Sequence, residues 1–280
     1  MERQRRLDET RQSWDHATRL HNAHKRDQAA FLRAGGSTLF PEEQELLGEL
    51  RDRRLLHILC NSGQDTLCLA ARGAACVGVD LSGEAVAFAR QLAHESGLPA
   101  TFHESEVFAF LESELERAPF DLVFGSYGCL PWIDDVRRLF ALVRDRLAPG
   151  GRAVFVEFHP LAWSFDERFQ LVDPYFAPGR VFSQPVSDYV GESGAALAPS
   201  GFEASVVGVN PHQAHAFQHT VADLVTAAID AGLTIEALRE WPYANGCRLH
   251  AGLVATDHKR FTTPPDVPNL PLMLGLVARR

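Results

Sequence analysis

Hydrophobic and polar positions follow two kinds of pattern through the middle of the chain. Short apolar runs, typical of buried strands, occupy residues 55–59, 75–79, 100–103, 120–125 and 153–158. Stretches with helical spacing of their apolar residues lie between several of these runs, at residues 66–71, 83–96 and 136–147. Strands that alternate with helices form parallel crossovers with helices on both faces of the sheet. The pattern therefore predicts a doubly wound α/β fold.

The flanking regions differ from this core. Residues 8–32 contain no Gly or Pro and predict one helix that ends before Gly35-Gly36, and a second helix follows Pro41. From 160 to about 216 the alternation breaks, with many Pro, Gly and aromatic residues, before a helix at 221–231 and strands at 234–240 and 272–278. We expect a helical cap at 1–45, a core at 46–159, a lid at 160–216 and the rest of the core at 217–280.

Composition narrows the class of protein. The 36 acidic and 27 basic residues give a net charge of −9, which disfavours nucleic acid and anionic lipid as partners. No apolar run is long enough to cross a bilayer, and the N-terminus mixes charges of both signs without an apolar stretch. The five cysteines are odd in number and lack metal-like spacing, which indicates reduced thiols. We expect a cytoplasmic monomer or homodimer that acts on a small molecule.

The first loop of such a sheet is the place to look for a ligand, because ligands collect beyond the carboxyl ends of parallel strands. Residues 60–66 form a small polar turn that leads into a helix, whose free N–H groups favour a carboxylate. Asp80 stands at the end of the second strand. An acid in this position can accept hydrogen bonds from both hydroxyls of a ribose.

These motifs resemble a known family. Residues 55–63 (LLHILCNSG) and 77–82 (VGVDLS) resemble the first and second motifs of class I S-adenosylmethionine (SAM)-dependent methyltransferases. Residues 104–107, 120–126 and 147–151 resemble later motifs in the same order, and the Cys-x-x-Gly-x-Asp loop resembles that of a bacterial small-molecule subgroup. The resemblance implies a Rossmann-like sheet of seven strands, SAM as cofactor and methyl transfer to a small-molecule acceptor.

The resemblance also implies roles for individual residues. The expected cofactor contacts are Cys60, Asn61 and Gly63 on the methionine part, Asp80 at the ribose hydroxyls, Leu81 and Val107 on the faces of adenine, Glu106 at its amino group, Ser126 near the sulfonium, and Ser82 with no particular group of the cofactor assigned to it. The sequence departs from the family where His57, Leu59 and Asn61 replace the usual acid and two glycines. The contact to the cofactor's amino group is therefore in question, and Asp80 followed by Ser82 also fits a simple helix cap.

Methyl transfer is an in-line displacement, so the protein chiefly has to align the acceptor and exclude water. His159 and His219 are the candidate general bases, for an acceptor that holds a proton. Candidate acceptor contacts are Tyr127, Trp132, Trp163, Tyr175 and Trp14. Aromatic side chains stack on flat rings, so they predict a planar aromatic or heteroaromatic acceptor methylated on nitrogen or oxygen. The lid aromatics equally fit a core of the insertion itself.

The sequence leaves several assignments of residues and of function open. Trp14, His21 and Lys25 share approximate helical spacing, and either close over the cofactor or form a solvated or core-facing stripe. A metal site at His212, His215 and His219 is not expected. The alternative functions are an NAD(P)-binding oxidoreductase, although Asp65 would oppose a phosphate at the first loop, and a SAM-binding module without catalysis.

Overall fold

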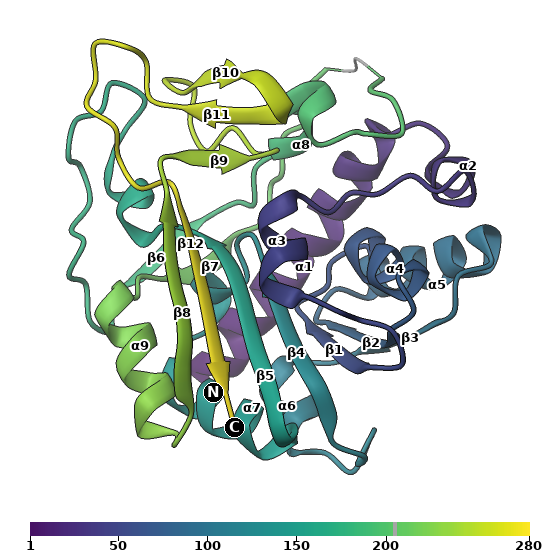
Figure 1. The fold of residues 1–280 in the computed structure, drawn as a ribbon. Coiled ribbons are helices and arrows are strands. Elements are labelled where there is room, and N and C mark those ends of the chain that lie inside the picture. The colour runs from purple at the N-terminus through teal and green to yellow at the C-terminus, as the bar shows by residue number, and fades with distance from the viewer. Residues whose placement is uncertain (204–205) are drawn as a thin grey trace.

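The computed structural model describes residues 1–203 and 206–280, and its centre is a sheet of seven strands in the order β3-β2-β1-β4-β5-β12-β8 (Figure 1). The first five pair in parallel, and β12 runs antiparallel between β5 and β8. This confirms the predicted doubly wound, mostly parallel sheet of seven strands. The strands are β1 Arg54–Ile58, β2 Ala75–Asp80, β3 Ala100–Glu104, β4 Phe120–Ser126, β5 Leu147–Phe158, β8 Thr234–Trp241 and β12 Met273–Arg279.

Helices cover both faces of the sheet, because both sides of its strands are apolar. Within β1, Leu55 packs into the core on one face, and Leu56 and Ile58 pack into the core on the other. The first face is covered by α2 Gln28–Arg33, α3 Pro41–Leu47, α4 Gln64–Ala71 and α5 Gly83–Ser96. The second is covered by α6 Val107–Glu112, α7 Val136–Arg146 and α9 Val221–Asp230.

The N-terminal region holds two helices where the sequence predicts one over residues 8–32. Helix α1 spans Glu2–Ala23, and α2 begins after Asp27, whose carboxylate accepts a hydrogen bond from the Ala30 N–H. Between them the backbone pairs with residues 201–203, through bonds from Arg26 N–H to the Gly201 carbonyl and from Glu203 N–H to the His24 carbonyl. An aspartate cap and a partner strand distant in sequence thus override the uninterrupted helical composition.

The segment after β5 has more structure than its irregular sequence suggests. The part of residues 160–216 that the structure describes, which we call the lid segment, contains β6 Val181–Gln184, β7 Ala214–Phe217 and α8 Tyr189–Ser193. Strands β6 and β7 pair antiparallel, and β7 packs against α1. A small sheet of β9 Tyr243–Asn245, β10 Val254–Thr256 and β11 Arg260–Thr262 lies beyond the end of β8 (Figure 1). The sequence pattern predicted neither this sheet nor α6.

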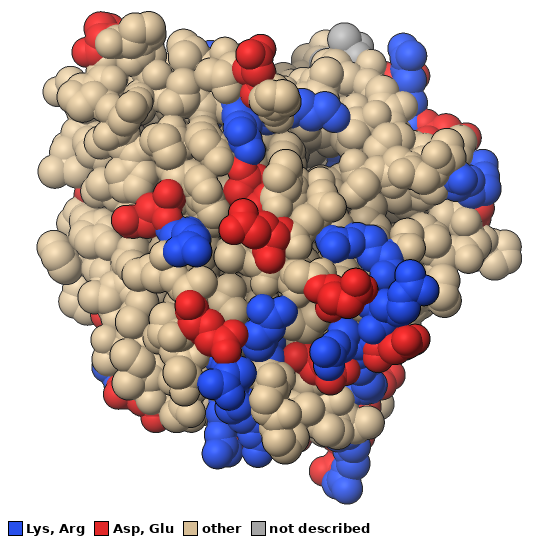
Figure 2. Space-filling model, viewed as in Figure 1, with Lys and Arg blue, Asp and Glu red and all other residues tan. Residues whose placement is uncertain are grey.

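The surface carries charges of both signs. On the face drawn in Figure 2, basic and acidic side chains are interspersed and form no uniform basic track. Among the residues that the structure describes, no helix has the length and apolar character needed to span a bilayer. All five cysteines lie within these residues and are free thiols.

The start of α4 depends on a glycine. Gly63 has φ +75°, and a Cβ added there would lie 2.7 Å from the Ala89 Cβ and 2.8 Å from the Phe102 ring. Gly97, the left-handed cap of α5, has φ +72° and open space around it. We expect Gly97→Ala to lower the free energy of unfolding by about 1–2 kcal/mol, the cost of the backbone conformation alone. Gly63→Ala should cost roughly 1–3 kcal/mol more, because it also overpacks the helix–sheet contact.

Urea denaturation of the two variants measures this difference. Equal losses of stability would show that the contact of Gly63 with Ala89 and Phe102 relaxes freely, contrary to the packing found here.

Candidate active site

A cavity of about 950 Å³ lies beyond the carboxyl ends of the parallel strands. It is lined by α1, by the loops after β1, β2, β3 and β4, by the lid segment and by the small sheet. Of the predicted site residues, the cavity lining includes Cys60, Asn61, Asp80, Leu81, Glu106, Val107, Ser126, Tyr127, Trp132, Trp163 and Trp14. The topology thus brings together residues from both ends of the sequence at one edge of the sheet.

The loop after β1 makes its turn with a single glycine. Leu59, Asn61 and Gly63 have φ values of 50°, 49° and 75°, so the left-handed conformation recurs at every second residue. Asn61 tolerates this conformation, and its side-chain oxygen accepts a bond of 2.6 Å from the Ser62 N–H. Leu59 is strained, at about 1–3 kcal/mol. The backbone shape that glycines provide in the family is therefore kept although two glycines are lost. Gly63 shapes the turn and is not part of the cavity lining.

Asp80 joins the first two loops. One carboxylate oxygen accepts from the Asn61 N–H at 2.7 Å, and the other from the Ser82 N–H at 2.9 Å. Burial, and to a smaller extent the charge of Asp15, raises the pKa of Asp80 to about 6. A carboxylate has about four lone-pair sites, so these two bonds leave Asp80 able to accept from a further donor.

Ser82 caps α5, as the alternative reading of Asp80 followed by Ser82 has it, and it is not part of the cavity lining. It is fully buried, its hydroxyl accepts from the Ala85 N–H at 3.1 Å, and it donates to the Asp15 carboxylate at 2.6 Å. Asp15 belongs to α1, so this cap also ties the N-terminal helix to the second loop.

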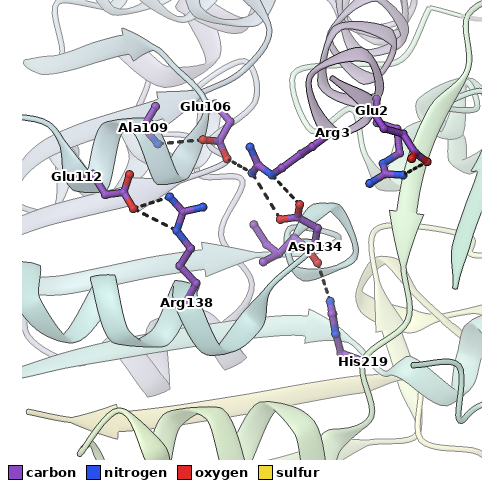
Figure 3. Close-up of polar contacts among 10 residues, drawn as sticks. Glu2, Arg3, Glu106, Ala109, Glu112, Asp134, Arg138 and His219 are labelled. Carbon is purple, nitrogen blue, oxygen red and sulfur yellow. Dashed lines mark hydrogen bonds and ion pairs between the residues drawn. The ribbon is translucent and has the colours of Figure 1, made fainter. Parts of the chain in front are cut away.

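At the third loop, Glu106 is held on both sides. It caps α6 by accepting from the Ala109 N–H at 2.9 Å, and it pairs with Arg3 of α1 at 3.1 Å. Figure 3 shows Arg3 reaching from α1 to Glu106 and to Asp134, with 2.7 Å to the latter. Sequence reasoning missed Arg3, because nothing local indicates which loop the first turn of α1 meets.

His57 occupies the place of the family's usual acid. It is 1% exposed, with Nδ1 2.8 Å from the Thr66 hydroxyl and Nε2 3.4 Å from the Ser126 hydroxyl. Burial lowers its pKa to about 3, so the ring is neutral at physiological pH. This position therefore supplies no negative charge to a ligand.

Aromatic rings from distant segments close the cavity above the first loop. Trp14 of α1 packs edge-on against Trp132 at 5.4 Å and against Tyr189 of the lid segment at 6.4 Å. The Tyr189 hydroxyl accepts from the Asn61 side-chain amide at 3.4 Å. We call these three rings the aromatic roof. Trp14, His21 and Lys25, for which the sequence left a cofactor-facing and a solvated or core-facing stripe open, all line the cavity.

A second row of rings forms another wall. Phe40, Tyr127, Phe158 and Trp163 follow one another with centroid distances of 6.1, 5.3 and 6.1 Å. We call this row the aromatic wall. The Tyr127 hydroxyl accepts from the Asn245 amide at 3.0 Å, and the same amide donates to the buried Glu42 carboxylate at 2.8 Å.

The predicted bases do not face the cavity. His159 caps a short helical turn by accepting from the Leu161 N–H at 3.1 Å, and its other ring nitrogen lies 2.8 Å from Glu240. His219 donates to the Ile133 carbonyl at 2.7 Å (Figure 3). Neither is part of the cavity lining, and their role as general bases stays a prediction. Both histidines instead hold loops in position.

The positions of two further side chains, Tyr175 and His215, follow from their hydrogen-bond partners. The Tyr175 hydroxyl accepts from the Val221 N–H at 3.0 Å, so this predicted acceptor contact caps the start of α9 outside the cavity lining. His215 contacts Glu9 and Ser183 and thus does not join His219 at a common site. In the described part of the chain, no group of three His, Cys, Asp or Glu side chains is arranged to hold a metal ion.

Comparison with known proteins settles the class of this site. Residues 55–151 match the family model described as a methyltransferase domain. This region is a class I SAM-dependent methyltransferase domain. The protein is accordingly an enzyme that uses SAM, and the oxidoreductase alternative is set aside. No curated protein sequence matches the chain significantly.

Solved structures share the fold of the methyltransferase. A SAM-dependent methyltransferase from Mesorhizobium loti has a TM-score of 0.54 at 22% identity, covering 86% of this chain and 96% of that one. A protein from Listeria monocytogenes described as a SAM-dependent methyltransferase also reaches 0.54, at 16% identity and with coverage of 85% and 96%. Geranyl diphosphate C-methyltransferase from Streptomyces coelicolor A3(2) reaches 0.51 at 13% identity, with coverage of 85% and 77%.

The residues present fit the cofactor. Asp80 lines the cavity and would take the ribose hydroxyls, and the apolar Leu81 and Val107, also in the lining, would flank the adenine. The cavity volume is near the upper end of the usual range for small-molecule sites, about 300–1,000 Å³, which leaves room for an acceptor beside the cofactor.

Because the pKa of Asp80 is raised, we expect the affinity of the protein for its cofactor to depend on pH. The ionised carboxylate accepts hydrogen bonds, and it becomes protonated as the pH falls through about 6. We therefore expect the affinity for S-adenosylhomocysteine (SAH) to fall at low pH, by about tenfold at one unit below that pKa. Asp80→Asn should bind weakly at every pH, without this dependence.

Calorimetric titration with SAH between pH 5 and 8 tests the expectation. Asp15→Asn is the matched control, since removing the neighbouring charge should move the midpoint to lower pH. A wild-type affinity that stays constant over this range would rule out Asp80 as the ribose contact.

Proposed function

We propose that this methyltransferase transfers the methyl group of SAM to a small planar aromatic or heteroaromatic molecule, at nitrogen or oxygen. The observation that carries the proposal is the aromatic wall. Tyr127 directly follows β4 and Phe158 is the last residue of β5, and Tyr127 is next to Ser126, the residue that the family resemblance places near the sulfonium. Flat apolar rings stack on ring faces better than on branched aliphatic groups.

The chain's own part in the reaction is alignment. SAM supplies a methyl carbon activated by the sulfonium. Ser126 and Tyr127 lie at the end of β4, and the buried Glu157 fixes the loop that follows, since its carboxylate accepts from the Gly128 and Leu130 N–H groups. The aromatic roof excludes water above the first loop. Much of the rate acceleration of such a displacement comes from holding the two reactants in line in a site without water.

The wall carries a polar group that orients the acceptor. The Tyr127 oxygen already accepts from Asn245, so its O–H proton is free to donate to a ligand, and no described residue is found to accept it. Burial raises the pKa of Tyr127 well above its usual value, which keeps the hydroxyl protonated. We propose that Tyr127 donates a hydrogen bond to a ring nitrogen or oxygen of the acceptor.

We also propose that the acceptor is a free small molecule and the enzyme cytoplasmic. The cavity is bounded by α1, the lid segment and the small sheet, which suits a compact acceptor better than a polymer. The five free thiols and the net charge of −9 agree with this proposal. A monomer or a homodimer is equally compatible with it.

Incubation with isotopically labelled SAM and a panel of acceptors tests the proposal. The panel pairs phenols and nitrogen heterocycles with their saturated ring counterparts, and mass spectrometry reads out the products. We expect methylated products from flat rings and little from saturated ones. Preferred methylation of saturated or open-chain acceptors would refute the aromatic assignment.

A substitution at Tyr127 tests the contribution of its hydroxyl separately from that of its ring. Tyr127→Phe keeps the ring of the aromatic wall and removes the hydroxyl. We expect the kcat/KM for the best acceptor to fall about 10- to 100-fold, the effect of one lost buried hydrogen bond, while the affinity for SAH stays unchanged. An equal loss for both ligands would show that the hydroxyl supports the site as a whole.

A further inference from the structure

The charged amino-acid end of the cofactor needs side chains that balance its charges. SAM ends in a zwitterion, an ammonium and a carboxylate on one carbon, and a charged group needs a partner when it leaves water. The family's usual acid is replaced by His57, whose ring is neutral and has both nitrogens engaged by Thr66 and Ser126. The charges that hold the zwitterion must therefore come from elsewhere in the cavity.

Lys25 is a cation without a partner. It lines the cavity, and its side chain makes no hydrogen bond or ion pair with the residues that the structure describes. By contrast, Arg3 pairs with Glu106 and Asp134, and Arg6 pairs with Glu2. Burial lowers the pKa of Lys25 to about 8, and the charge of Asp65 opposes this shift.

The position of Lys25 is fixed over the first loop. On one side of it in the chain, Asn22 donates to the Ser62 hydroxyl at 3.0 Å. On the other side, Gln28 accepts from the Gln64 side chain at 2.7 Å. The stretch that carries Lys25 is thus bound at both ends to the loop where the methionine part of the cofactor belongs.

Asp65 is the acid that faces it. Asp65 lies in the first turn of α4 and lines the cavity, and its carboxylate accepts a hydrogen bond from the Thr38 hydroxyl. It forms no ion pair with any described cation, although its charge and that of Lys25 influence each other's pKa. Of the other acids in the lining, Glu106 and Asp134 pair with Arg3, and Asp173 pairs with Arg180.

We propose that Lys25 and Asp65 together bind the amino-acid end of the cofactor, with Lys25 on its carboxylate and Asp65 on its ammonium. Lys25 and Asp65 both belong to the cavity lining next to the first loop, and two opposite charges there match a zwitterion, whose own charges are separated by a short distance. Neighbouring His21 donates Nε2–H to the Ser187 carbonyl and leaves Nδ1 without a partner among the described residues. Its ring is neutral and adds no charge that would repel the ammonium.

The proposal concerns the cofactor and does not depend on the nature of the acceptor. It assigns to the N-terminal helical region and to α4 a task that the loop acid performs in the family.

Two probes separate the zwitterion from the rest of the cofactor. SAH carries the amino-acid end, whereas 5′-methylthioadenosine keeps the adenosine and the thioether but lacks it. We expect Lys25→Met to lower the affinity for SAH about 10- to 100-fold in calorimetry, as for the loss of one charge-assisted hydrogen bond, and to leave the affinity for methylthioadenosine unchanged.

Asp65→Asn should give the same selective loss, and the asparagine oxygen keeps an acceptor for Thr38. Arg26→Met is the matched control, because Arg26 is the next residue, exposed and paired with Glu203. Lys25→Arg, which keeps the charge, should retain most of the affinity for SAH.

Three results would overturn the proposal. One is unchanged SAH affinity in Lys25→Met and Asp65→Asn. Another is an equal loss for SAH and methylthioadenosine, which would mean that the substitutions damage the site in general. A wild-type protein that binds neither probe would remove the cofactor site itself, and is thereby distinguished from failure of the zwitterion contact alone.

Discussion

The hydrogen bond from the Asn61 N–H to the Asp80 carboxylate is the contact on which the site depends. It joins the loop after β1 to the end of β2, and it exists because parallel pairing brings the carboxyl ends of these strands to one edge of the sheet. The same carboxylate accepts from Ser82, so one side chain sets the spacing of the first two loops. The strained turn at Leu59 is tolerated because these bonds over-determine its conformation.

Helix α1 extends this arrangement across the whole cofactor region. Its residues bond to all three loops: Asn22 to Ser62, Asp15 to Ser82 and Arg3 to Glu106. Trp14, between these contacts, belongs to the aromatic roof. A helix that precedes the matched residues 55–151 thus contacts all three loops, and the cavity lining includes segments well outside these residues.

The doubly wound sheet and the loops that resemble the family's motifs were predictable because their signals are local. Apolar runs, the turn at 60–66 and Asp80 after the second strand are visible in short windows, and the fold and the SAM-dependent class followed from them. The split of the N-terminal helix, the small sheet of β9, β10 and β11 and the place of Arg3 were not predictable. The helix split and the place of Arg3 depend on partners far along the chain, as Lys25 shows by pairing its backbone with Phe202. The strands of the small sheet have three residues each, too few for a hydrophobic pattern to show.

The sequence by itself determined the doubly wound sheet, the carboxylate at the second strand and the loss of the family's acid at His57. The tertiary structure decided which ionisable side chains face the cavity: it directed His159 to Glu240 and His219 to the Ile133 carbonyl, and it left Lys25 and Asp65 at the first loop. The physical reason is the distance along the chain over which each of these effects acts. Hydrophobic periodicity acts within a few residues, whereas the burial and pairing of a charge depend on surfaces that meet after the chain has folded.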